Sequence, residues 1–154
     1  MELSSNPGQR QTPLIGPEAA QQIQAAIENA ENLTSGEIRV VIDPDGNKGE
    51  DPYHEAVKWF HRLGMTRTRQ RNAVLIYINP HTRRYAVVGD EGIHRCVGTD
   101  FWKRVAEVMH THFYAGNLLT GIIEGVRTVG ESLAQYFPID GGDNTNELPD
   151  EVVY

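Results

Sequence analysis

A group of acidic and polar residues surrounds a glycine-bearing turn near the middle of the chain. Its members are Asn72, Gly89, Asp90, Glu91, Gly92 and, further along, Asp100. Three carboxylates beside a turn and a helix start offer the oxygen ligands that hard cations prefer. The amides of the same glycine turn could instead hold an anion. The third interpretation is a surface turn followed by a helix cap, without a ligand.

A basic run precedes this group. Arg67, Arg69 and Arg71 alternate with polar residues, and no aromatic residue is interleaved with them. Nucleic-acid binding needs more basic surface than a chain of net charge −7 provides, so we expect no nucleic-acid partner. These arginines are expected either to pair with Asp90 and Glu91 or to contact a phosphate through two hydrogen bonds.

Other patterns that could carry chemistry fail on spacing. If Asp43 is taken as the first position of a calcium loop, Lys48 falls where the EF-hand needs glycine and His54 where it needs glutamate. A solvated acidic turn is favoured there, with weak cation binding as the alternative.

Cys96 is the only cysteine, so no intramolecular disulfide can form, and we expect it to be a small buried residue.

The elements that must position these residues centre on a hairpin. The apolar run 73–78 predicts a strand buried on both faces, and Asn79-Pro80 predicts a turn into a second strand over 84–88. Upstream, residues 37–42 read as a strand that is followed by a helix. That helix begins with Asp51 as N-cap and Pro52, and it ends at Gly64. This βαβ unit predicts that strands 37–42 and 73–78 are parallel.

Three more helices follow from three- and four-residue apolar spacing. They run from Pro17 to about Asn32, from Thr99 or Asp100 onward, and from near Asn117 to Phe137. The predicted fold class is therefore α/β, a three-layer α/β/α sandwich around a short mixed β-sheet. In this fold the hairpin returns Gly89 to the edge where strand 73–78 begins, which brings the polar group together.

The ends of the chain differ from its body. Residues 1–15 predict a flexible N-terminal arm, 16–138 the folded domain, and 139–154 a C-terminal tail that holds five of the 21 acidic residues. We expect this acidic tail to lack a packed core, so that deleting residues 140–154 leaves the melting temperature almost unchanged. No apolar run has the ~18–20 residues of a membrane helix, and no export signal is visible at Met1, so a soluble cytoplasmic protein is expected.

Three segments resemble the TPM domain, a family that includes thylakoid-lumen proteins linked to photosystem II repair. They are Thr34-Ser35-Gly36-Glu37-Ile38-Arg39-Val40, Asn72-Ala73-Val74-Leu75-Ile76, and Arg83 with Val88-Gly89-Asp90-Glu91-Gly92-Ile93. The resemblance covers about residues 16–138 and points to a cytoplasmic bacterial subgroup. It implies an α/β/α sandwich. It also implies the acid phosphatase activity described for some members and the Ca²⁺ or Mg²⁺ binding of others.

The chain departs from the family pattern beside the central strand. Members typically have Asp-Asn-Gly where this chain has Arg71-Asn72-Ala73, and Gly-Tyr-Gly-Leu-Glu where it has the longer segment 89–94. Asp100 matches the later aspartate of the family. An arginine in place of an acid removes a cation ligand and adds a like charge. Asp90 and Glu91 are the residues that could replace the lost ligand.

Two classes of function follow. The first is a binding or regulatory module, dependent on Ca²⁺ or Mg²⁺, for a protein partner or a small phosphorylated ligand. Its ligand-binding residues would be Arg71, Asn72, Gly89 and Gly92. The second is a weak metal-assisted acid phosphatase, in which Asp90, Glu91 and Asp100 hold the cation and Arg71 orients phosphate. The first is favoured because no nucleophile or general base stands out.

Overall fold

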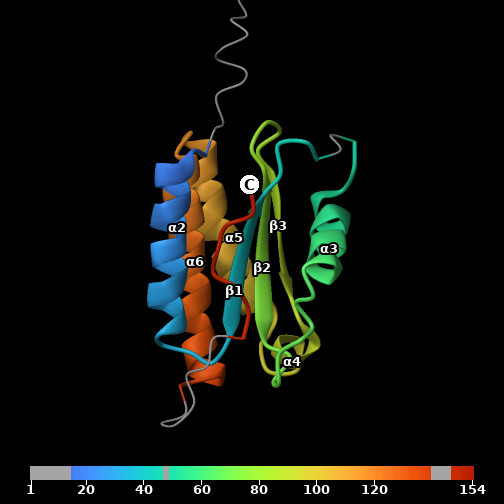
Figure 1. Ribbon diagram of the computed structural model, residues 1–154, viewed down its shortest axis with the longest axis vertical. Coiled ribbons are helices and arrows are strands. Elements are labelled where there is room, and N and C mark those ends of the chain that lie inside the picture. The colour runs from blue at the N-terminus through green and yellow to red at the C-terminus, as the bar shows by residue number, and fades with distance from the viewer. Residues whose placement is uncertain (1–14, 47–48, 140–146) are drawn as a thin grey trace, which may run out of the picture.

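The computed structural model describes residues 15–46, 49–139 and 147–154. The helices and strands are α2 (Pro17–Glu31), β1 (Glu37–Ile42), α3 (Pro52–Arg62), β2 (Ala73–Asn79), β3 (Arg84–Gly89), α4 (Glu91–His94), α5 (Thr99–Tyr114) and α6 (Leu118–Tyr136). Helices α2, α5 and α6 cover one face of the sheet and α3 covers the other (Figure 1). The predicted α/β/α sandwich around a short mixed sheet is confirmed.

The sheet has the strand order β1-β2-β3. β1 pairs in parallel with β2, so that Glu37 lies opposite Ala73, and β2 pairs antiparallel with β3, so that Val74 lies opposite Gly89. Every residue of β2 is buried, as expected for a central strand that is apolar on both faces. The register brings the start of β1, the start of β2 and the end of β3 to one end of the sheet.

Local signals set most helix boundaries. Asp51 caps α3 by accepting a hydrogen bond from the Tyr53 amide at 3.0 Å, and Gly64 follows that helix with φ +66°. Glycine commonly adopts this left-handed conformation at the end of a helix. The expected cap of α5 was one residue off, because Gly98 is its N-cap and Thr99 already lies in the helix. The four-residue helix α4 was not anticipated.

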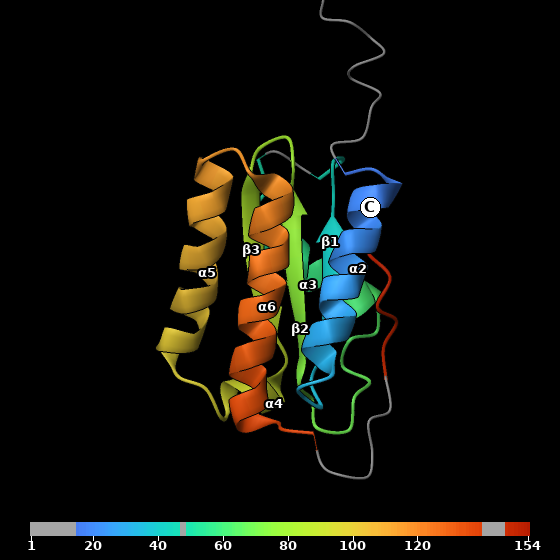
Figure 2. The same ribbon diagram turned by 90° about the vertical axis from the view of Figure 1, so that its left-hand side faces the viewer.

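Helix α6 lies between α5 and α2 in the helical layer (Figure 2). A Cβ atom at Gly121 or Gly125 would collide with α5. The neighbours are the side chains of Phe113 and Met109 rather than a backbone. Both glycines therefore make room for large apolar side chains from α5, which offsets their poor helix propensity. None of the described helices is long and apolar enough to cross a membrane.

The C-terminal residues 147–154, here called the strap, lie along the outer edge of β1 (Figure 1). Val153 forms a parallel bridge with Val41, in which the Ile42 amide donates to the Val153 carbonyl at 2.8 Å and the Val153 amide to the Val40 carbonyl at 3.1 Å. Leu148 is 7% exposed and belongs to the core on the α3 side. The expectation of a tail without packed residues is wrong for the strap.

The reason for the strap lies in β1. Ile38, Val40 and Ile42 face the three-helix layer, whereas Val41 belongs to the core on the α3 side, and strand alternation places Glu37 and Arg39 on that side too. Helix α3 packs on β2 and β3, and the strap covers this face of β1 instead. Residues 1–14 of the predicted arm lie outside the described residues, and Ile15 is buried in the core.

Burial of β2 predicts the effect of a cavity mutation. Leu75 is fully buried, so Leu75→Ala should lower the free energy of unfolding by about 2–5 kcal/mol through lost burial and a residual cavity. Leu33→Ala is the matched control, because Leu33 is 56% exposed and should lose far less. Urea denaturation of both variants measures the difference. Equal losses at the two positions would contradict the central placement of β2.

Candidate functional site

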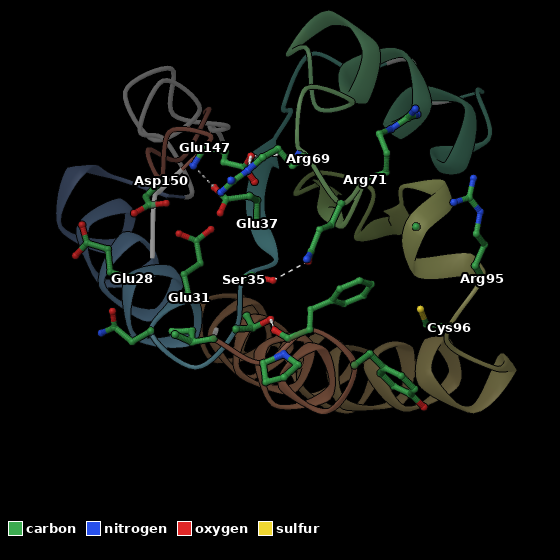
Figure 3. Close-up of a pocket in the computed structure, with 18 residues that line it drawn as sticks. Glu28, Glu31, Ser35, Glu37, Arg69, Arg71, Arg95, Cys96, Glu147 and Asp150 are labelled. Atoms are coloured by element: carbon green, nitrogen blue, oxygen red, sulfur yellow. Dashed lines mark hydrogen bonds and ion pairs between the residues drawn. The ribbon is translucent and has the colours of Figure 1, made fainter. Parts of the chain in front are cut away.

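A cavity of about 1060 Å³ opens where β1 and β2 begin and β3 ends. The ends of α2 and α6, the loops before β1 and β2, the start of α4, the residues after it, and the strap all contribute to its walls (Figure 3). The side chains that could do chemistry there are Glu28, Glu31, Ser35, Glu37, Arg69, Gln70, Arg71, Arg95, Cys96, Glu147 and Asp150. Arg71 and Arg95 lie on one side of this cavity and Glu31, Glu37 and Asp150 on the other, whereas Arg69 lies beside Glu147 (Figure 3).

One side, here called the acidic wall, consists of Glu31, Glu37, Glu147 and Asp150 (Figure 3). Glu31 reaches from the last turn of α2, and its Oε2 accepts a hydrogen bond from the Ile38 amide at 2.8 Å. Burial, together with a hydrogen bond to Asp150, raises the pKa of Glu31 to about 10. Glu31 therefore keeps its proton at neutral pH and shares it with Asp150.

Asp150 fits this interpretation. Its Oδ1 atom is buried and has no other hydrogen-bond partner among the described residues. An ionised carboxylate at that place would carry an uncompensated oxygen away from water, which is costly. The protonated Glu31 carboxyl group adds no second negative charge beside this buried oxygen.

Glu37 is the second buried acid of the wall. It is 3% exposed, and its Oε1 accepts hydrogen bonds from the amides of Glu147 at 3.0 Å and Leu148 at 2.8 Å. Burial raises the pKa of Glu37 to about 7, although both hydrogen bonds favour the ionised form. Near neutrality this carboxyl group is partly protonated. The acids of the wall therefore hold protons because the positive charge near them is too small to keep all of them ionised.

The opposite side of the cavity carries arginines that are already paired. Arg71 donates from Nε and Nη2 to the two carboxylate oxygens of Asp90 at 2.6 and 2.8 Å, and Nη1 contacts Glu91 at 3.4 Å. Arg95 donates to Glu91 at 3.1 Å, and Arg69 approaches the Glu147 carboxylate at 3.5 Å. The predicted pairing of Arg71 with Asp90 and Glu91 is confirmed.

Backbone contacts hold the pair of Arg71 and Asp90, here called the arginine clasp, in place. The Gly92 amide donates to the Arg71 carbonyl at 2.9 Å, and a Cβ atom on Gly92 would collide with the carbonyls of Gln70 and Arg71. Arg71 has φ +51°, a left-handed conformation that non-glycine residues seldom adopt. The two bonds to Asp90, which is 5% exposed and caps α4, compensate this strain.

The other predicted ligand residues lie at the same end of the sheet. Asn72 is buried, and its Nδ2 donates to Gln70 Oε1 at 3.1 Å. Gly89 is covered by the indole ring of Trp102, which leaves no room for a side chain there. Hairpin geometry therefore brings together Arg71, Asn72 and the 89–92 turn, as predicted from the sequence.

Asp100 stands apart from this group. It is exposed in the first turn of α5, and no hydrogen bond or ion pair joins it to Asp90 or Glu91. Across residues 15–46, 49–139 and 147–154, no three or more His, Cys, Asp or Glu side chains are arranged to hold a metal ion. A cation at Asp90 would have to displace the Arg71 guanidinium, so Ca²⁺ or Mg²⁺ binding by Asp90, Glu91 and Asp100 stays a prediction.

Two further expectations have clear outcomes. Cys96 is exposed at the rim of the cavity, so the expectation of a buried cysteine is wrong.

Asp43, at the opposite end of β1, accepts hydrogen bonds from the Tyr77 hydroxyl at 2.8 Å and from Trp59 Nε1 at 3.3 Å. Its carboxylate therefore ties the loop after β1 to β2 and α3. Residues 47–48 of that loop lie outside the described residues.

A family model described as TPM domain matches residues 9–132, so this chain belongs to the TPM domain family. The comparison with curated proteins yields no match.

Several solved structures resemble the chain. The NMR structure of the BA42 protein from the psychrophilic bacterium Bizionia argentinensis has a TM-score of 0.84 and 34% identity, covering 92% of this chain and 95% of its own. The N-terminal domain of the cg2496 protein from Corynebacterium glutamicum has a TM-score of 0.61 and 17% identity, covering 79% and 76%. The second likeness shows the shared fold alone.

The arginine clasp yields a stability prediction. Arg71→Ala would leave the buried Asp90 carboxylate without its counter-charge, so the variant should melt at a clearly lower temperature than the wild type. Arg95→Ala is the matched control, because the Arg95 side chain is 71% exposed and pairs only with the exposed Glu91. Thermal unfolding followed by circular dichroism compares them. If both variants melt alike, the Arg71–Asp90 pair does not hold this end of the fold together.

Proposed function

We propose that this TPM domain is a non-catalytic binding module that takes a positively charged group at the acidic wall of its cavity. The observation that supports this proposal is the raised pKa of Glu31 and Glu37 beside Glu147 and Asp150. Acids that retain protons at neutral pH do so because burial and neighbouring carboxyl groups penalise their charge. A ligand cation would relieve that penalty and take the place of the proton.

The positive charge could come from two sources. Ca²⁺ or Mg²⁺ is the cation that the family resemblance implies, and either would need the carboxylates of the wall to move closer together. An ammonium or guanidinium group, on a small molecule or on a basic side chain of a protein partner, would bind through hydrogen bonds to the same carboxylates. In both cases binding releases the proton that Glu31 and Asp150 share.

The opposite side of the cavity suits an anionic part of the same ligand. Arg71 and Arg95 line it, and Ser35, which is hydrogen-bonded to Gln70, lies between them and the acidic wall. A phosphate that arrived with a cation could exchange for Glu91 at these arginines, because guanidinium groups bind phosphate and carboxylate in similar geometry. A phosphorylated ligand accompanied by a cation therefore matches both sides of the cavity.

Metal-assisted phosphatase activity is the second candidate, and the arginines beside Ser35 are the observation that favours it. The Ser35 hydroxyl, however, donates to Gln70 Oε1 at 2.9 Å. A neutral amide oxygen cannot take the proton of an attacking serine, so this contact does not activate Ser35 as a nucleophile. Binding is favoured over turnover for that reason.

Calorimetric titration tests the proposal. CaCl₂, MgCl₂ and arginine amide are titrated separately into the full chain at pH 6, 7 and 8. We expect at least one of them to bind with proton release, and its affinity to rise by up to about tenfold per pH unit. Glu31→Gln should leave only the proton release that Glu37 contributes near neutrality and almost none at pH 8, whereas Glu28→Gln, at the rim of the cavity, should retain the full release.

A double variant separates the acidic wall from the site at the 89–92 turn. Asp90→Asn with Asp100→Asn should leave binding intact if the acidic wall is the site, and Asp43→Asn with Asp45→Asn is the remote control. Loss of binding in the first pair alone would move the cation to Asp90. Absence of binding for all three probes would refute the proposed function, and hydrolysis of a phosphomonoester above background would favour the second candidate.

A further inference from the structure

The strap is attached to the body mainly through polar groups. Its first amides, from Glu147 and Leu148, donate to the Glu37 carboxyl group, and the Glu151 carbonyl accepts a hydrogen bond from Arg39 at 3.3 Å. Further along, Val153 pairs with the edge of β1. Leu148 is the only strap residue of the buried class, and Val152 and Val153 pack partly against the core. Few apolar contacts therefore oppose release of the strap.

Docking of the strap also buries charge. Arg39 is 7% exposed, its Nε atom has no hydrogen-bond partner among the described residues, and burial lowers its pKa. Glu37 is enclosed with it. Both groups would regain water if the strap left, which offsets part of the free energy that the strap gains from its own contacts. The free-energy difference between the docked and released states is consequently small.

A shared proton lies at the centre of this balance. Glu31 belongs to α2 and Asp150 to the strap, and the two carboxyl groups are joined by one hydrogen bond. The charged or titratable groups that line this region are Glu28 from α2, Glu37 and Arg39 from β1, Arg69 from the loop before β2, Tyr136 from α6, and Glu147 from the strap. Acids outnumber bases there, so nothing replaces the proton once it leaves.

We propose that the strap is a proton-controlled closure of the β1 edge, docked while Glu31 and Asp150 share a proton and released when that proton is lost. Release uncovers Glu37, Arg39 and the unpaired backbone of β1, and it opens one wall of the cavity. An exposed strand edge accepts another extended segment readily. The strap thus keeps this edge closed under acidic and neutral conditions. This inference needs no ligand and stands apart from the proposed binding function.

The direction of the pH effect follows from proton linkage. The pKa of Glu31 lies at about 10 in the docked state, against an ordinary 4.5 for a solvated glutamate. Docking is therefore fully favoured below pH 4.5 and weakens as the pH rises toward 10. Glu37 adds to the same trend between pH 4.5 and about 7. Between about pH 7 and 10, where Glu31 alone contributes, loss of one shared proton weakens docking by about tenfold per pH unit.

Hydrogen exchange of the full chain tests this proposal without a ligand. The Val153 amide reports docking because it donates to Val40, and the Ile76 amide in central β2 reports global unfolding. After correction for intrinsic exchange, protection of Val153 should fall by about tenfold per pH unit above pH 7, where Glu37 no longer contributes, while Ile76 stays protected. Glu31→Gln, which keeps a hydrogen-bond donor toward Asp150 without a titrating group, should make Val153 protection nearly independent of pH.

Controls decide between the outcomes. Glu28→Gln removes an acid at the cavity rim and should keep the pH dependence of the wild type. Asp150→Asn, made on the strap itself, should flatten it as Glu31→Gln does. Unchanged Val153 protection across this pH range in the wild type, or full pH dependence in Glu31→Gln, would overturn the proposal. Parallel loss of protection at Val153 and Ile76 would overturn it as well, since the chain would then unfold as a whole.

Discussion

The C-terminal region and the cavity depend on how the α3-side face of β1 is covered. Three helices pack against one side of the sheet, but the single helix on the other side, α3, packs on β2 and β3. Glu37 and Arg39 on β1 therefore need another cover, and the strap supplies it with amides for Glu37 and a carbonyl for Arg39. Backbone groups of the strap and side chains of β1 form each other's hydrogen bonds there. Without these bonds, both sets of polar groups would be buried without partners.

The same arrangement creates the cavity and its chemistry. The strap brings Glu147 and Asp150 beside Glu31 and Glu37, so four acids meet in a partly buried space. Protonation of Glu31 makes this arrangement possible at neutral pH. Across the cavity the balance is reversed, because Arg71 supplies a permanent positive charge to the buried Asp90. One side of the site is thus neutralised by an arginine of the chain and the other by protons, and protons can be exchanged for a ligand cation.

The sequence predicted what local patterns and chain topology determine. Local signals include the apolar run of β2, the Asp51 cap and the glycine after α3. Each of them indicates a single local structure. The pairing of Arg71 with Asp90 was predictable because the hairpin returns Gly89 to the start of β2.

The acidic wall could not be predicted in the same way. Glu37 and its partners in the strap are 110 residues apart, and no periodic pattern connects them. The tail was judged from its five acids and two adjacent glycines, which hid the few residues, Leu148 and Val153 above all, that attach it. One signal was available: Glu37 and Arg39 alternate with apolar residues in β1, which indicates a face without a helix against it.

A direct measurement of the Glu31 carboxyl group tests this account at its centre. NMR of the side-chain carboxyl ¹³C nuclei, recorded on the ligand-free chain across a pH series, resolves each acid separately. The account predicts that Glu31 remains protonated at pH 7 and titrates only well above it, with Glu37 titrating near neutrality. Titration of Glu31 close to the ordinary 4.5 would contradict the shared proton, and with it the origin proposed for both the acidic wall and the closure of the β1 edge.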